Sequence, residues 1–86
     1  MVEGKVSVNN ESGLHARPAA SLVQFVKDFD GSVELVKEDK VANAKSIFNV
    51  MALGISKGTE ITVRIDGENE EENLDKLIKF IEKLEG

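Results

Sequence analysis

The chain of 86 residues contains no cysteine, no tryptophan and no tyrosine, and it has only one histidine and one proline. Without cysteine there is no disulfide framework, so the fold must be stabilised by packing, and a reducing compartment is favoured. One histidine and no cysteine leave only carboxylates to complete a coordination shell. We therefore expect no metal site and no cofactor.

Positive charge is also scarce. Eleven lysine and arginine residues stand against sixteen aspartate and glutamate residues, which gives a net charge of -5. No basic cluster interrupts this excess of acid. The composition therefore argues against a nucleic-acid binder, which needs a basic face.

Long apolar runs are missing as well. The first ten residues contain none, which argues against a signal peptide, and no stretch approaches the roughly 20 apolar residues of a membrane span. We predict a cytoplasmic protein without membrane insertion. Its length fits a single domain, residues 1–86, with a modest core and little room for an elaborate active site. We therefore expect it to act with partners, and nothing demands more than a monomer.

Alternation of apolar and polar residues predicts four strands. They cover Val2–Val8, residues 32–36, residues 41–43 and Thr59–Asp66. The second and third strands flank a polar turn at residues 37–40, which is typical of a hairpin, and we expect the third to be an edge strand. In the last strand the isoleucines and valine at 61, 63 and 65 face inward.

Helical spacing of apolar residues predicts three helices. The first opens at Ala16, and its apolar residues recur up to Phe29. The second is short, residues 46–53, with Ser46 as its cap and Gly54 as its stop. The third starts at Asn69 and carries the stripe Leu74, Leu77, Ile78, Ile81 and Leu84, with surface pairs Glu72–Lys76 and Asp75–Lys79.

The predicted order is strand, helix, strand, strand, helix, strand, helix. This order favours an α+β fold in which helices cover one face of a four-stranded antiparallel sheet. Fold class alone does not identify the chemistry, because sheets of this type carry many unrelated activities.

The only histidine, His15, lies two residues before Arg17 and three before Pro18. Pro18 suits the first turn of a helix, where the amide hydrogen that it lacks would have no intrahelical acceptor. If the helix opens at Ala16, His15 occupies the cap, and the free N–H groups of Ala16 and Arg17 point toward the imidazole. The helix dipole and the Arg17 guanidinium both favour an anion there. A neutral imidazole in this place can act as a nucleophile that carries a phosphoryl group.

Other interpretations of His15 stay open from the spacing alone. The residue is equally consistent with an incidental surface histidine or with a neutral cap that has no chemistry. Serine hydrolysis is a poor alternative, because Ser12 and His15 lie on one short loop with no orienting acid and no oxyanion hole.

The short helix carries apolar residues on two opposite sides. An advance of about 100° per residue places Val50 and Leu53 on one side and Ile47, Phe48 and Met51 on the other. We favour burial of the second set beneath a neighbouring loop. The alternative is an exposed apolar patch, and a methionine beside an aromatic residue suits a surface that docks several partners.

Ser46 has a structural interpretation and a regulatory one. Most serines at such a position only cap the helix. A phosphate at Ser46 would be tolerated, because a dianion at a helix N-terminus meets the favourable end of the dipole.

Residues 12–20 read SGLHARPAA and residues 45–58 read KSIFNVMALGISKG. Both segments, at this distance from one another, closely resemble the histidine-containing phosphocarrier (HPr) family of the phosphoenolpyruvate-dependent sugar phosphotransferase system. The similarity spans essentially the whole chain. It implies the open-faced β-sandwich of that family, with the element order βαββαβα.

The resemblance also implies roles for the residues around His15. His15 would accept a phosphoryl group on Nδ1 from enzyme I and pass it to sugar-specific IIA proteins, so the chain would be a carrier and not an enzyme. Arg17 would stabilise the transferred group, and Ser12 with the N–H groups of Ala16 and Arg17 would complete a phosphate cradle. His15 argues against the HPr-like paralogue that lacks this histidine. Whether the relay serves transport or nitrogen-type regulation stays open.

The second segment matches the family's regulatory region. Ser46 corresponds to the serine that HPr kinase/phosphorylase modifies with ATP, which implies a link to carbon catabolite repression through a catabolite-control transcription factor. Ile47, Phe48 and Met51 correspond to the hydrophobic docking surface. Phe48 and Asn49 depart from the methionine and glycine common in firmicute members, which weakens the regulatory expectation and leaves His15 untouched.

Overall fold

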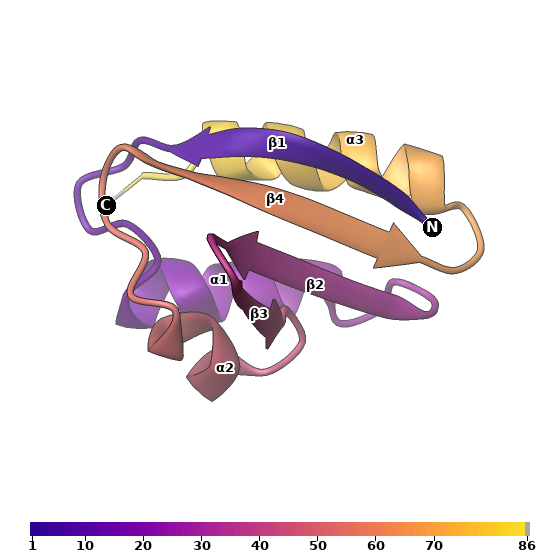
Figure 1. Cartoon of the computed structure of the whole chain (residues 1–86), viewed down its shortest axis with the longest axis horizontal. Helices are drawn as coiled ribbons and strands as arrows, with labels where there is room; N and C mark the ends of the chain where they lie inside the picture. Colours follow the sequence, from indigo (N-terminus) through magenta and orange to yellow (C-terminus); the bar gives the residue numbers. More distant parts are fainter. Residues whose placement is uncertain (86) are drawn as a thin grey trace.

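The computed structural model describes residues 1–85, which form seven elements in the predicted order (Figure 1). The strands are β1 (Val2–Val8), β2 (Ser32–Lys37), β3 (Lys40–Asn43) and β4 (Thr59–Asp66). The helices are α1 (Ala16–Val26), α2 (Ile47–Ala52) and α3 (Glu70–Glu82). The bounds of β1 and β4 are the predicted ones, because both strands alternate cleanly between apolar and polar residues.

The four strands form one antiparallel sheet in the order β1-β4-β2-β3. The predicted antiparallel sheet is therefore confirmed, and β3 is an edge strand as expected. The buried strand residues lie on one face: Val6, Val8, Val33, Leu35, Ala42, Ile61, Val63 and Ile65. On the opposite, open face, Arg64 and Glu34 are cross-strand neighbours, and Arg64 Nε lies 3.5 Å from Glu34 Oε1.

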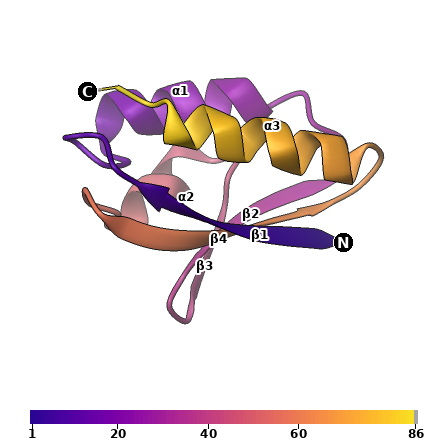
Figure 2. The ribbon, with the colours of Figure 1, turned by 90° about the horizontal axis from the view of Figure 1, so that it is seen from above.

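The helices cover the apolar face, as the sequence predicts. Figure 2 shows α1 and α3 side by side on one side of the sheet, while α2 contacts α1 and β3. Leu22 and Val26 of α1, Val50 of α2 and Leu77 of α3 are fully buried against the sheet. Each such side chain contributes about 1.5–3 kcal/mol by leaving water. No helix among the described residues is both long enough and apolar enough to cross a membrane.

The first helix is shorter than its apolar spacing predicts. It ends at Val26, and the N–H of Phe29 donates to the Val26 carbonyl at 3.0 Å in the following turn. The Phe29 ring still packs against the core and meets Phe25 edge to face at 5.7 Å between centroids. The apolar spacing therefore predicted the burial of Phe29 correctly but placed the end of the helix too late. A turn after the helix can direct an aromatic ring toward the same core.

The hairpin turn is also tighter than predicted. Lys37 pairs with Lys40 in the sheet, which leaves only Glu38 and Asp39 in the turn. Glu38 has a φ of 57°, a left-handed conformation of the kind that tight hairpin turns require.

The third helix begins at Glu70 and buries Asn73, Leu77 and Ile81. Asn73 was not among the predicted core residues, and Leu84 lies beyond the helix end, where it is partly buried. Of the predicted surface pairs, Asp75 and Lys79 form an ion pair at 3.0 Å. Within residues 1–85, no ion pair joins Glu72 and Lys76.

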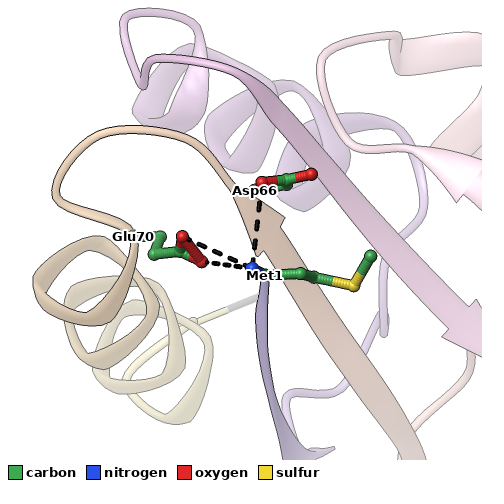
Figure 3. Close-up of polar contacts among 3 residues, drawn as sticks. All are labelled: Met1, Asp66 and Glu70. Atoms are coloured by element: carbon green, nitrogen blue, oxygen red, sulfur yellow. Dashed lines mark hydrogen bonds and ion pairs between the residues drawn. The ribbon is translucent and has the colours of Figure 1, made fainter.

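The N-terminal ammonium group ties the start of β1 to the start of α3 (Figure 3). The Met1 nitrogen lies 2.8 Å from Glu70 Oε2 and 3.8 Å from Asp66 Oδ1. The hydrogen bond to Glu70 raises the pKa of the Met1 ammonium above its ordinary value of 8.0, with help from the charges of Glu70 and Asp66 and against partial desolvation. A folded pKa above the unfolded one means that the stability contribution is complete below the unfolded pKa and is lost as pH rises through the folded pKa.

Acetylation of the Met1 amine should therefore lower the urea midpoint of unfolding at pH 7, because it removes the charge that Glu70 binds. The loss should shrink at alkaline pH, above the raised pKa of the folded amine, because the free amine has then lost its proton in both states. In a Glu70→Gln background the effect of acetylation on the urea midpoint should differ much less between pH 7 and alkaline pH. An equal effect of acetylation at both pH values would contradict the ion pair.

Candidate functional site

His15 lies directly before α1 and occupies its N-cap. Its backbone is extended, with φ -84° and ψ -170°, and its carbonyl accepts the N–H of Ala19 at 2.8 Å. The imidazole makes no capping hydrogen bond and is exposed. The ring is therefore accessible and is not committed to holding the helix, as a group that receives a phosphoryl unit must be.

Unused hydrogen-bond donors surround the start of α1. Ala16 and Arg17 are its first two residues, and within residues 1–85 neither N–H donates to a backbone or side-chain acceptor. The Arg17 side chain is exposed, and no ion pair among the described residues occupies its guanidinium. These donors and this charge are available to an anion at the helix N-terminus.

The loop before His15 is held by backbone contacts with the segment after α2. Leu14 is buried, and its N–H donates to the Ile55 carbonyl at 3.0 Å. Gly13 has a φ of 59°, and a Cβ atom there would lie 2.3 Å from the Ile55 carbonyl oxygen. Only glycine allows this close approach, because any side chain would meet the backbone of the neighbouring segment.

Within the loop, the buried Asn10 donates from Nδ2 to the Gly13 carbonyl at 2.8 Å. The His15 N–H donates to the Ser12 carbonyl at 3.3 Å. Ser12 is exposed, so its hydroxyl is accessible on the same loop. Sequence reasoning missed Asn10 and Ile55 as residues that shape the site. The one signal in the sequence was Gly13, just before the start of the helix, and it did not indicate that Ile55 would be the residue in contact with it.

The side chain of Ser46 caps α2, as predicted. Its Oγ accepts the N–H of Asn49 at 3.4 Å and the side-chain Nδ2 of the same residue at 2.8 Å. Asn49 therefore adds a second donor to the Ser46 hydroxyl.

The preference for burial of the second apolar side of α2 is wrong for two of its three residues. Phe48 is 81% exposed and Met51 is 37% exposed, while Ile47 packs partly against the core. Val50 and Leu53 occupy the core side, as the helical projection predicts. One side of a two-turn helix is enough to anchor it, so the other side remains open. We refer to Ile47, Phe48 and Met51 as the α2 patch.

The α2 patch and His15 lie at the same end of the molecule. The helix α2 contacts α1 and lies where α1 begins (Figure 1).

A groove lies elsewhere on the molecule. It has a volume of about 700 Å³, lies between α1 and α3, and is lined mainly by Phe25, Phe80, Leu84 and the lysines at 76, 79 and 83. None of the predicted site residues lines it. In the described part of the chain, no group of three or more histidine, cysteine, aspartate or glutamate side chains could hold a metal ion.

The chain is similar to known proteins over almost its whole length. Residues 2–83 match the family model described as "PTS HPr component phosphorylation site". The HPr-like protein Crh of Bacillus subtilis (strain 168) is 46% identical over 83 residues, which cover 96% of this chain and 98% of that protein. The phosphocarrier protein HPr of Vibrio cholerae serotype O1 is 37% identical over 84 residues, which cover 98% of this chain and 99% of that protein.

Among solved structures, HPr-C-His from Thermoanaerobacter tengcongensis has the same open-faced arrangement. It superposes with a TM-score of 0.90 at 40% identity, and the match covers 95% of this chain and 92% of that one.

Gly13→Ala should destabilise the protein by about 2–5 kcal/mol, because left-handed strain adds to the clash with the Ile55 carbonyl. Gly58→Ala is the matched control. Gly58 has a φ of 88°, but a Cβ atom there would meet nothing within 4 Å, so only the strain of about 1–2 kcal/mol applies. Urea unfolding of both variants measures the difference. Equal losses would show that the contact between the two loops is not tight.

Proposed function

Since this chain belongs to the HPr family, whose phosphocarrier proteins serve the phosphotransferase system as carriers rather than enzymes, we propose that it carries a phosphoryl group on His15. Enzyme I is the proposed donor, and sugar-specific IIA proteins are the proposed acceptors. The observation that supports this role best is the exposed imidazole at the N-cap of α1, next to two backbone N–H groups without acceptors in residues 1–85.

The transfer needs little from the protein beyond position and charge. A neutral His15 ring attacks phosphorus through Nδ1; the Nδ1–P bond forms while the bond from phosphorus to the donor breaks, and the donor leaves with its electron pair. The N–H groups of Ala16 and Arg17 donate to the phosphoryl oxygens, and the Arg17 guanidinium offsets their charge. The Ser12 hydroxyl completes this cradle. The step requires no metal and no cofactor.

The α2 patch is the proposed docking surface for these partners. Phe48 supplies a large exposed aromatic side chain and Met51 an adaptable one, and both residue types are common at the centres of protein interfaces. Docking on this exposed surface leaves His15 free to enter the partner's active site. We propose that the carrier acts as a monomer, which size-exclusion chromatography with light scattering can test.

Incubation with phosphoenolpyruvate and enzyme I should add one acid-labile phosphoryl group to the wild-type chain and none to His15→Ala, as read by intact mass. Arg17→Lys should slow the transfer by about tenfold or more, because an ammonium cannot bind two phosphate oxygens as the planar guanidinium does.

The matched control is Arg64→Lys, which alters an arginine on the open face of the sheet and should leave the rate unchanged. The carrier function is wrong if the wild type gains no acid-labile phosphate, or if His15→Ala gains as much as the wild type.

We infer a second, regulatory function from the neighbourhood of Ser46. Its hydroxyl is at the N-cap of α2 and directly precedes the α2 patch, so a phosphate there would add negative charge beside the docking surface. HPr kinase/phosphorylase is the proposed modifying enzyme, and a catabolite-control transcription factor is the proposed reader of the modified form. An arginine-bearing surface on that reader would pair with the phosphate.

After treatment with HPr kinase/phosphorylase and ATP, the chain should bind the transcription factor more tightly than the unmodified chain, and Ser46→Ala should abolish the gain. Phe48→Ala should weaken this binding by about 1–2 kcal/mol, because the ring is exposed and available to the partner. Val41→Ala is the control, since Val41 is 51% exposed on the edge strand β3. Binding that does not respond to phosphorylation would exclude the regulatory function.

A further inference from the structure

Lys37, the last residue of β2, reaches the C-terminal end of α2. Its ammonium donates to the Leu53 carbonyl at 3.1 Å and to the Gly54 carbonyl at 3.0 Å. These carbonyls belong to the end of a helix, where backbone oxygens lack intrahelical donors and the dipole favours a positive charge. Gly54 has a φ of 65°, so the chain turns sharply at the point that Lys37 holds.

The residue after this turn contacts the loop between β1 and α1, residues 9–15, which we call the His15 loop. Ile55 follows Gly54, and its carbonyl accepts the Leu14 N–H and lies against Gly13. A short series of direct contacts therefore runs from the Lys37 ammonium through residues 53–55 to Leu14, the neighbour of His15. In Figure 1 the loops that carry these contacts lie together at one end of the sheet.

We propose that Lys37 is a positioning residue for both the α2 patch and the His15 loop. By holding the turn at residues 53–54, it fixes the end of the helix that presents Met51 and keeps the Ile55 carbonyl in place for Leu14. Near-attack geometry is sensitive to small displacements, so a looser turn slows transfer to His15 even though Lys37 does not touch the phosphoryl group. The part of this inference that concerns phosphoryl transfer rests on the proposed function. The part that concerns how Lys37 holds the two loops does not depend on that function.

An ion pair also joins these two loops, but it contributes less than the Lys37 contacts. Lys57 and Glu11 form an ion pair at 3.0 Å, with side chains 60% and 82% exposed. Such surface pairs contribute little and are screened by salt. Lys37 instead donates to two backbone carbonyls, one of them in a partly buried position.

The test compares Lys37→Met, which keeps the apolar stem, with Lys37→Arg, which keeps the charge and the donors. Lys40→Met is the matched control, because Lys40 pairs with Lys37 in the hairpin and its ammonium has no hydrogen bond or ion pair in the described part of the chain. Urea midpoints identify any variant with a general loss of folding.

The first measurement is amide hydrogen exchange, which does not depend on the proposed function. In Lys37→Met the Leu14 and Gly54 amides should exchange about tenfold faster, while the amide of Ile65 in β4 stays protected. Lys37→Arg should restore most of the protection, and Lys40→Met should match the wild type. Unchanged exchange at Leu14 in Lys37→Met would overturn the proposal.

The second measurement is the rate at which enzyme I phosphorylates His15. Lys37→Met should lose about three- to tenfold, and Lys37→Arg should recover to within about twofold of the wild type. A rate equal to that of the wild type, in a variant whose Leu14 amide exchanges faster, would show that the contact does not position His15 for transfer. If the wild type itself accepts no phosphate, the carrier function fails, and the exchange result still decides whether Lys37 holds the two loops.

Discussion

The organisation of this protein depends on one contact between two loops, in which the Leu14 N–H donates to the Ile55 carbonyl and Gly13 lies directly against the same backbone. The contact joins the segment before α1 to the segment after α2. On one side it fixes the approach of the chain to His15, and on the other it fixes the end of the helix that carries the exposed Phe48. A backbone hydrogen bond suits this purpose because it sets distance and direction at once, whereas a contact between long side chains would leave both loose.

The residues that support folding and those that support the proposed transfer occupy different layers. Stability comes from the apolar interface between the sheet and the helices, where Leu22, Leu35 and Ile61 are fully buried. His15 and Arg17 contribute little to that core because they are exposed. Phe48 is exposed as well, although burying its ring would stabilise the fold. A carrier needs this separation, since its reactive group must enter another protein's active site without any loss of the core.

The sequence was most informative where a single periodicity governed an element. The strict alternation of β4 gave its bounds and its inward residues, whereas its place between β1 and β2 came only from the structure. It was less informative at the end of α1, because Phe29 continues the helical spacing from a turn that is no longer helical. The α2 patch shows the same limit. The helical projection separated its two sides correctly, but nothing in six residues of helix indicates whether a loop covers the second side.

The sequence by itself determined the order of the elements, the faces that the longer strands and helices bury, and the presence of a single histidine at the start of α1. These features follow from local periodicity, from the special backbone of proline and from the single histidine. Only the tertiary structure decided that Phe48 is open to solvent, that Ile55 supports Leu14 and that Lys37 holds the turn between α2 and β4. Each of these depends on which segments meet across the fold, and a glycine or a lysine in the sequence does not name the backbone that it will contact.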